Sequence, residues 1–229
     1  MIEAIVLAGG LGTRLREVVS DVPKPMAPIG NRPFLAYLLE NLAKNGVTRV
    51  ILSVGYMSEK IFEYFGDSYY GMSIAYSVEK ELLGTGGAIK LALDLIKGDY
   101  AFIFNGDTYL NINLQLIDKL YNQHKELIII GVDVYNVGRY GKLTLDENNI
   151  YLTGFEENKE NKSGLINAGC YVLDKKIFHG MATADKFSFE RDFILKNLDK
   201  KKFKCIKVDG FFLDIGIPGD LEKLKEYFK

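Results

Sequence analysis

Short apolar runs alternate with amphipathic helical segments over the first 134 residues, and this alternation constrains the fold more than any other feature. The run at 127–134, for example, has the length and the β-branched content of a buried strand. The expected strands are residues 2–8, 49–54, 73–77, 100–104 and 127–134, and the expected helices are residues 33–45, a short helix from Ser58, 86–97 and 114–124. This order predicts a parallel sheet with helices on both faces.

After residue 135 the pattern changes to strands that follow one another with few helices between them. Residues 142–145 and 150–155 flank a polar turn and predict a hairpin. Further strands are expected at 166–173, 203–208 and 211–213, with a helix that begins at Ser188 and a closing helix that reaches Phe228. We therefore expect one α/β domain over residues 1–229, a Rossmann-like mixed, mostly parallel sheet flanked by helices, with a small β-rich part.

A glycine-rich turn, LAGGLGTR at residues 7–14, leaves the first expected strand. Its three glycines let the backbone approach a polyphosphate, and the N–H groups of the turn and of the following helix are suitable donors. Arg14 adds a positive charge. The turn is not a P-loop, because no Gly-Lys-Ser/Thr follows, and it is not a dinucleotide fingerprint, because Leu15 stands where Gly or Ala is required. Unless it is a plain strand-to-helix connection, the turn predicts a nucleotide phosphate site.

Four of the five prolines lie between residues 23 and 33, within and after the sequence Pro23-Lys24-Pro25-Met26-Ala27-Pro28. Proline fixes φ and disfavours helix, so this segment is expected to be a stiff extended loop. Such a loop would hold Lys24 in one place, and a lysine held near phosphates is a candidate catalytic residue.

Two aspartates follow expected strands: Asp107 comes after 100–104, and Asp214 comes after 211–213. Ligands of open α/β sheets bind beyond the carboxyl ends of the strands, so both carboxylates are expected in one crevice. One or two carboxylates, with substrate phosphates and water, commonly hold Mg²⁺. The alternative is that each aspartate caps the element that follows it.

The composition argues against several other kinds of protein. The net charge of −1 provides no extended basic surface, so we expect no nucleic-acid partner. Cys170 and Cys205 lie in apolar runs, and His124 and His179 form no metal-ligand pair, so structural roles are expected for all four. No apolar run approaches the ~20 residues of a membrane helix, and no signal peptide is apparent, so we expect a cytoplasmic protein without a membrane partner.

An ordered set of motifs resembles the sugar-1-phosphate nucleotidyltransferases, also called nucleotide-sugar pyrophosphorylases. No single motif is decisive, but their order along nearly the whole chain is specific. The motifs are LAGGLGTRLR at 7–16, PKPM at 23–26, ELLGTGGA at 81–88, NGDTY at 105–109, RYG at 139–141, FEEN at 155–158, NAGCYVL at 167–173, SFERD at 188–192 and DIGIP at 214–218.

The resemblance implies a GT-A-like nucleotidyltransferase domain in which a sugar 1-phosphate oxygen attacks the α-phosphorus of a nucleoside triphosphate and pyrophosphate leaves. It implies a nucleotide-binding half at 1–134 and a sugar-binding half at 135–229. By match to the family motifs, Arg14 would neutralise pyrophosphate, Lys24 would contact the reacting phosphates, and Asp107 and Asp214 would hold Mg²⁺. The implied nucleotide-binding residues are Leu7, Ala8, Gly9, Gly10, Gly12, Thr13, Glu81, Gly84, Thr85, Gly86 and Gly106, and the implied sugar-binding residues are Gly141, Glu157, Asn167 and Gly169.

The chain departs from the family pattern at Asn158, where a lysine often follows the motif glutamate. Lys159 or Lys162 could replace that lysine if the loop is shifted. The sequence also stops soon after DIGIP, so we do not expect the left-handed β-helix domain that some relatives carry.

Within the family, the form ELLGTGGA, with a glutamate before LGT, resembles one branch in particular. This branch contains the guanylyltransferases for mannose and manno-heptose 1-phosphates and the uridylyltransferase for N-acetylmuramate 1-phosphate. The motifs resemble the heptose enzymes most, which implies transfer of GMP from GTP to D-glycero-α-D-manno-heptose 1-phosphate. The product, GDP-heptose, supplies bacterial capsule and other surface glycans. The mannose and muramate substrates remain alternatives, and the sequence leaves a homodimer open.

Two hypotheses from other classes compete with this interpretation. A non-catalytic nucleotide-sugar sensor would usually have lost a charged catalytic group, whereas Arg14, Lys24, Asp107 and Asp214 are all present. A nicotinamide-dependent oxidoreductase is disfavoured because no acidic residue follows the strand that ends at 53–55, where a ribose hydroxyl would bind.

Overall fold

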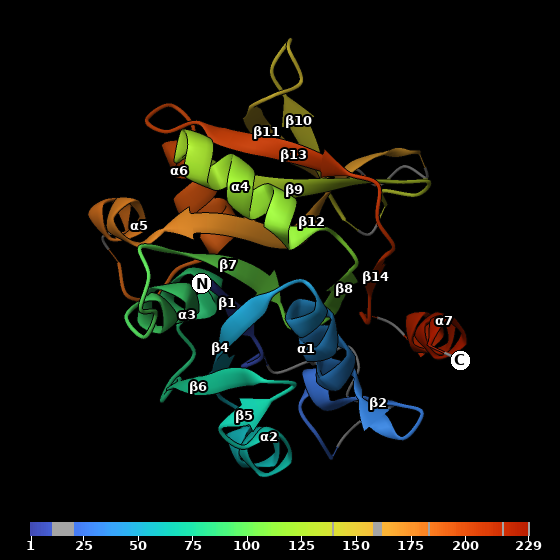
Figure 1. The fold of residues 1–229 in the computed structure, drawn as a ribbon. Coiled ribbons are helices and arrows are strands. Elements are labelled where there is room, and N and C mark those ends of the chain that lie inside the picture. Colours follow the sequence, from blue (N-terminus) through green and yellow to red (C-terminus); the bar gives the residue numbers. More distant parts are fainter. Residues whose placement is uncertain (11–20, 139, 158–161, 183, 217, 229) are drawn as a thin grey trace.

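The computed structural model describes residues 1–10, 21–138, 140–157, 162–182, 184–216 and 218–228 (Figure 1). In chain order the elements are β1 (Ile2–Leu7), the 3₁₀ turn η1 (Lys24–Met26), β2 (Pro28–Ile29), β3 (Arg32–Pro33), α1 (Phe34–Lys44), β4 (Val47–Val54), α2 (Ser58–Phe65), β5 (Ser68–Tyr69), β6 (Met72–Val78), α3 (Gly84–Leu93), β7 (Tyr100–Asn105), β8 (Thr108–Leu110), α4 (Leu114–His124), β9 (Leu127–Val134), β10 (Gly141–Leu145), β11 (Leu152–Glu157), β12 (Gly164–Asp174), α5 (Lys175–Met181), the π-helical turn η2 (Phe189–Ile194), α6 (Leu195–Asn197), β13 (Phe203–Val208), β14 (Phe212–Asp214) and α7 (Pro218–Tyr227).

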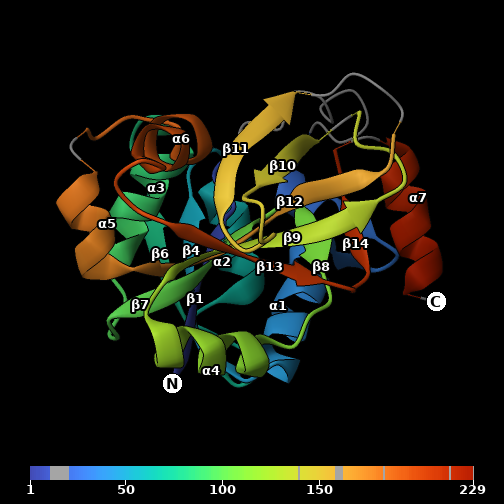
Figure 2. The same cartoon turned by 90° about the horizontal axis from the view of Figure 1, so that it is seen from above.

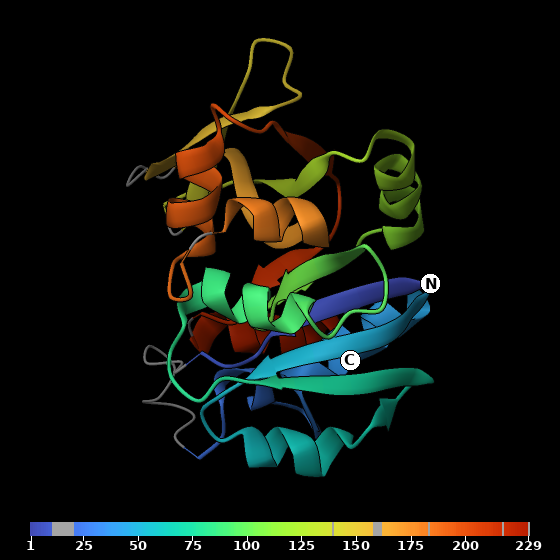
Figure 3. The ribbon, with the colours of Figure 1, turned by 90° about the vertical axis from the view of Figure 1, so that its left-hand side faces the viewer.

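Among the described residues, the main sheet has ten strands, eight of them in the order β11-β10-β12-β7-β1-β4-β6-β5. Strands β7, β1, β4 and β6 at its centre are parallel, and β12 joins β7 in antiparallel orientation. Figure 3 shows these strands edge to edge, with the green helix α3 in front of them. The expected α/β class, with a mixed and centrally parallel sheet flanked by helices, is therefore confirmed.

One strand of the first half is not part of the parallel centre. The sequence predicted β9 as a further parallel strand, but it pairs with β12 in antiparallel orientation and with β13 in parallel orientation. Its apolar sequence fits either place, because both leave it buried on two faces. Sequence pattern alone does not distinguish these neighbours.

Alternate residues of the central strands point into two separate cores. Ala4 and Val6 pack with α1 and α4 on one face, whereas Ile5 packs with α3 and α5 on the other. The two helix layers lie on opposite sides of the sheet when the molecule is seen from above (Figure 2). This two-sided burial explains the nearly continuous apolar sequence of β1.

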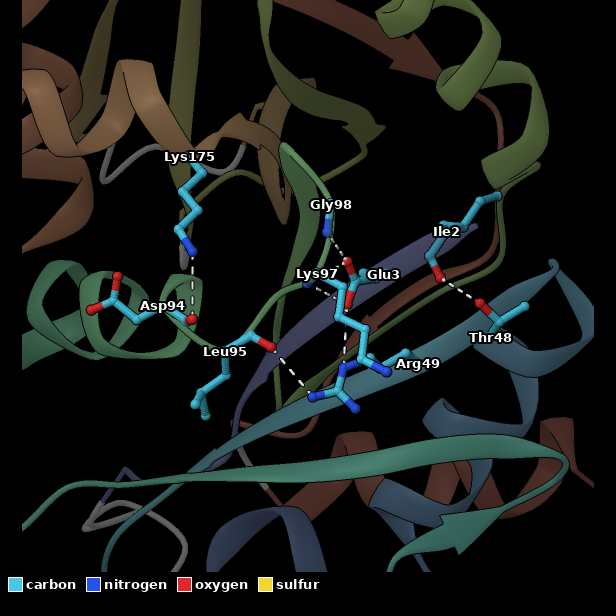
Figure 4. Close-up of polar contacts among 9 residues, drawn as sticks. All are labelled: Ile2, Glu3, Thr48, Arg49, Asp94, Leu95, Lys97, Gly98 and Lys175. Carbon is cyan, nitrogen blue, oxygen red and sulfur yellow. Dashed lines mark hydrogen bonds and ion pairs between the residues drawn. The ribbon is translucent and has the colours of Figure 1, made fainter.

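A buried carboxylate fixes the end of the sheet that lies away from the glycine-rich turn (Figure 4). Glu3 in β1 is only 3% exposed, and its carboxylate accepts the N–H groups of Lys97 at 2.9 Å and Gly98 at 2.6 Å. It also forms an ion pair with Arg49 of β4, whose Nε lies 3.3 Å from Oε1. Arg49 in turn donates to the carbonyl of Leu95. Glu3 therefore ties β1 and β4 to the segment between α3 and β7.

Among the described residues, no helix is both long and apolar enough to cross a membrane.

We predict that Glu3→Gln lowers the free energy of unfolding by about 1–3 kcal/mol, because one acceptor becomes an amide donor and Arg49 loses its buried counter-charge. Urea unfolding followed by circular dichroism measures the change. Glu147→Gln, in an exposed turn, is the matched control. Equal unfolding midpoints for the two variants would show that the Glu3 contacts do not stabilise the fold.

Candidate active site

A pocket of about 450 Å³ opens where β1, β6 and β7 end, which is the edge of a parallel sheet at which ligands bind. The glycine-rich turn, the start of α3 and the turn after β7 all contribute to its wall. The lining residues are Leu7, Gly9, Gly10, Lys24, Pro25, Glu79, Leu82, Gly84, Thr85, Ala88, Asn105, Gly106, Asp107 and Glu190. Six of the predicted nucleotide-binding residues therefore line one pocket: Leu7, Gly9, Gly10, Gly84, Thr85 and Gly106.

Two of these glycines lie very close to neighbouring atoms, which belong to a side chain at Gly9 and to the backbone at Gly106. A Cβ on Gly9 would lie 2.7 Å from Oε1 of Glu79, and a Cβ on Gly106 would lie 2.4 Å from the carbonyl oxygen of Leu7. The Gly106 N–H donates to that carbonyl at 3.0 Å. By contrast, no atom of the described residues lies within 4 Å of a Cβ on Gly10, which is exposed and lines the pocket.

The two predicted metal-binding aspartates do lie together, but not for the reason that the sequence suggested. Asp107 follows β7 of the main sheet, whereas Asp214 ends β14, which pairs with β8 in a separate two-stranded sheet. In that sheet Asp214 is opposite Thr108, and the N–H of Ile215 donates to the carbonyl of Asp107 at 2.9 Å. An antiparallel pairing, and not two parallel strand ends, therefore brings the carboxylates together.

Lys24 lies between these carboxylates. Its Nζ is 2.5 Å from Oδ2 of Asp107 and 3.8 Å from Oδ1 of Asp214. The lysine belongs to the η1 turn, which is closed by hydrogen bonds from the Met26 N–H to the Pro23 carbonyl and from the Ala27 N–H to the Lys24 carbonyl. The proline-rich segment thus holds the backbone of the lysine in place, but as a 3₁₀ turn and not as the extended loop that its sequence predicted.

The donor set of this cluster fits a divalent cation that also binds substrate oxygens. Within the part of the chain that the structure describes, no three His, Cys, Asp or Glu residues are grouped as a complete metal site. Two carboxylates without further protein ligands match the way Mg²⁺ is held, because that ion keeps several waters and binds substrate phosphates. Asp107 and Asp214 could therefore hold a metal that is shared with a nucleotide.

Glu79, which the sequence analysis did not select, lies on the opposite side of the glycine turn. It follows β6, accepts the Leu83 N–H at 3.2 Å and lies 3.5 Å from the Ser53 hydroxyl. Partial burial raises the pKa of Glu79 above its ordinary value. Its carboxylate is therefore a pocket acceptor whose charge depends on pH.

The glycines of the GTGG sequence pack against the segment 184–190, here called the docking segment. The Gly86 N–H donates to the Phe187 carbonyl at 3.0 Å, and the Phe187 N–H donates to the Leu83 carbonyl at 2.9 Å. A Cβ on Gly87 would lie 2.2 Å from the carbonyl oxygen of Asp185, and one on Gly86 would lie 2.1 Å from the Phe187 ring. Gly86 is not among the pocket-lining residues. Close packing of the docking segment thus accounts for Gly86 and Gly87.

A chain of hydrogen bonds connects α3 with β12. The Thr85 hydroxyl accepts the Phe189 N–H at 2.8 Å and lies 3.3 Å from Oε2 of Glu190. The Tyr171 hydroxyl donates to Oε1 of Glu190 at 3.0 Å and accepts the Asn167 side-chain amide at 2.7 Å. Burial, with the charge of Glu190 beside it, raises the pKa of Tyr171. The GTGG sequence and the NAGCY motif are therefore linked through neutral Tyr171.

The predicted sugar-binding residues lie on neighbouring strands. Gly141 in β10 pairs with Glu157 in β11, and the pairing of Lys142 with Ile166 places Gly141 beside the position of Asn167 in β12. At Gly169, β12 has a bulge with φ +65°, and a Cβ there would lie 2.6 Å from Nδ2 of Asn105. This bulge brings the NAGCY motif against the turn that carries Asp107.

Some predicted residues are not described, and others are not in the pocket wall. Gly12, Thr13, Arg14, Asn158 and Lys159 lie outside the described residues, whereas Lys162 is described and exposed. Ala8, Glu81 and Asp214 are not among the residues that line the pocket, although Asp214 lies 3.8 Å from Lys24, which does line it. Sequence reasoning missed Glu79, Asn105, Tyr171 and Glu190; for Glu190 the SFERD motif was a signal, but the residue was interpreted as part of a helix start.

We predict that Gly87→Ala destabilises the protein by about 1–3 kcal/mol, because the new methyl group must displace the backbone of the docking segment. Thermal unfolding measures this, with Gly180→Ala as the control: nothing lies within 4 Å of a Cβ there, and alanine is favoured in a helix. If Gly87→Ala is as stable as the control, the docking segment is not packed as described.

Comparison with known proteins identifies the family. Residues 3–228 match the family described as nucleotidyl transferase. The D-glycero-α-D-manno-heptose 1-phosphate guanylyltransferase of Campylobacter jejuni is 45% identical over 218 residues, which are 95% of this chain and 96% of that protein. The guanylyltransferase of the same description from Aneurinibacillus thermoaerophilus is 43% identical, over 98% of this chain and 97% of its own.

A solved structure agrees with these relatives. The crystal structure of HddC from Yersinia pseudotuberculosis is 40% identical, covers all of both chains and superposes with a TM-score of 0.89; HddC has also been crystallised with GMP-PN. The family match, the two relatives and this structure extend over nearly the whole chain. The protein described here belongs to the nucleotidyltransferase family.

Proposed function

We propose that this protein transfers GMP from GTP to D-glycero-α-D-manno-heptose 1-phosphate, with release of pyrophosphate and formation of GDP-heptose. The observation that carries the proposal is the identity of 45% and 43% to two proteins described by that activity, over at least 95% of the chain. The pocket at the strand ends is lined by Lys24 and Asp107, and Asp214 lies 3.8 Å from the Lys24 ammonium; these are the groups that such a transfer requires.

In the proposed reaction the protein acts mostly by positioning and by neutralising charge. Lys24 contacts the reacting phosphates, and Arg14 neutralises the departing pyrophosphate. Asp107 and Asp214 hold Mg²⁺, which supplies Lewis-acid stabilisation of phosphate charge when it is bound. The backbone of the glycine-rich turn lies beside the triphosphate, because Gly10 leaves room for it. Residues 1–134 provide the nucleotide-binding half and residues 135–229 the sugar-binding half.

The preference for GTP is proposed to depend on Glu79. Guanine presents an N–H and an amino group side by side, and a carboxylate offers two acceptors to match them. Glu79 lines the pocket, and its hydrogen bonds to Leu83 and Ser53 hold the side chain in place while leaving acceptor capacity on both oxygens. Uracil lacks this pair of donors, so the same carboxylate disfavours UTP.

The test is an assay of pyrophosphate release in the presence of Mg²⁺. GTP, UTP, CTP, ATP and dTTP are each combined with manno-heptose 1-phosphate, mannose 1-phosphate and N-acetylmuramate 1-phosphate. We expect release to be fastest with GTP and the manno-heptose 1-phosphate. Asp107→Asn should lower the rate by about 10²-fold or more, because it removes a charged metal ligand. A maximum with another pair would replace the proposed substrates, and activity with no pair would favour a non-catalytic sensor.

We predict that Glu79→Gln raises KM for GTP about tenfold or more and reduces the preference for GTP over UTP, because an amide offers one acceptor and one donor group. In the wild type, KM for GTP should rise as pH falls, since protonation of Glu79, whose pKa is raised by burial, removes an acceptor. This pH dependence should be absent in the variant. Glu147→Gln, at an exposed turn position outside the pocket wall, is the control. An unchanged base preference would contradict the role of Glu79.

A further inference from the structure

The position of Lys24 conflicts with simple metal binding at the two carboxylates. Its ammonium group lies 2.5 Å from Oδ2 of Asp107 and 3.8 Å from Oδ1 of Asp214, so it is beside both carboxylates that would hold a divalent cation. The three side chains are only 16%, 33% and 27% exposed, so water screens their charges incompletely. Lys24 is thus the counter-ion of the carboxylate pair.

The backbone geometry explains why a counter-ion is required there. The pairing of β8 with β14 and the hydrogen bond from Ile215 to Asp107 fix the two aspartates beside each other. Like charges at such a separation repel one another unless a cation lies between them. An ammonium ion and a divalent cation also repel one another, so they would not share the space between these carboxylates.

The lysine has a second anionic partner available when a nucleotide binds. Lys24 lines the same pocket as the glycine-rich turn, and the proposed function places phosphates in that pocket. The η1 turn fixes the lysine backbone through its prolines, while the long side chain keeps its rotatable bonds. The ammonium group can therefore move from carboxylate to phosphate without a change in the fold.

We propose that Lys24 is an internal counter-ion that excludes free divalent cations from Asp107 and Asp214 and yields this position to a metal that arrives with a nucleotide. The inference rests on the proposed function for its assignment of the two metal ligands. In the absence of nucleotide, a divalent cation must displace Lys24 from its ion pairs without compensation. With nucleotide present, the phosphates bind the displaced ammonium, so metal and nucleotide each strengthen the binding of the other.

The test measures Mn²⁺ binding to the nucleotide-free protein from the electron paramagnetic resonance signal of free Mn²⁺. Lys24→Met should bind Mn²⁺ about tenfold or more tightly than the wild type, because the competing charge is removed while the length of the side chain is kept. Lys24→Arg should remain as weak as the wild type. Lys204→Met is the matched control, because it breaks the ion pair of Lys204 with Glu126. The side chains of that pair have a similar exposure, and Lys204 lies on β13, outside the pocket.

A double variant and the wild type complete the test. Adding Asp107→Asn to Lys24→Met should abolish the gain in Mn²⁺ affinity, which assigns the gain to this carboxylate pair. In the wild type, a non-hydrolysable GTP analogue should increase Mn²⁺ binding beyond the amount held by the free analogue. This last measurement requires no variant, so the inference can be overturned even if Lys24→Met fails to fold.

Two results would overturn the inference: no gain of Mn²⁺ affinity in folded Lys24→Met, or wild-type binding of Mn²⁺ that is equally tight with and without the analogue. Neither result depends on turnover. Active wild-type protein with no gain in the variant would refute the counter-ion role and leave the proposed function intact. A gain in the variant with no transferase activity for any substrate pair would refute the proposed function and retain Lys24 as a cation competitor.

Discussion

The parallel pairing of β1 with β4 on one side and β7 on the other is the constraint on which the rest of the structure depends. It aligns the ends of these strands, so that the glycine-rich turn after β1 lies against the turn that carries Asp107, where Gly106 donates to Leu7. At the other end, Glu3 fixes the register of β1 relative to β4 and to the segment that enters β7. Pocket geometry and sheet stability thus depend on the same strand.

Local sequence signals predicted most of the elements and part of the site. The apolar runs located β1, β4, β7 and β9, because burial on both faces leaves a strong pattern. The prolines around Lys24 predicted a held lysine, and the structure places it in the pocket. Gly106 was predicted only through the resemblance of its NGDTY motif to the family, and the structure supplies the physical reason, since a Cβ there would meet the carbonyl of Leu7.

Those local signals could not predict which strands pair when they lie far apart in the sequence. The apolar sequence of β9 suits any buried strand, so its place between β12 and β13 depends on partners far along the chain. The joining of Asp107 and Asp214 follows from an antiparallel sheet of two short strands, whose sequences have no distinctive periodicity. Glu190 and Tyr171 become site neighbours only when the docking segment packs on α3.

Strand β12 changes partners along its length and thereby limits where the chain can be divided. Its second part pairs with β7, its first part with β10, and both parts with β9, with the Gly169 bulge between them. A fragment ending at residue 134 would retain β7 and β9 but lose the strand that joins them, which would expose apolar edges of both. Residues 1–134 and residues 135–229 therefore contribute strands to one sheet and depend on each other, and evolutionary exchange of residues 135–229 alone would require a replacement for β12.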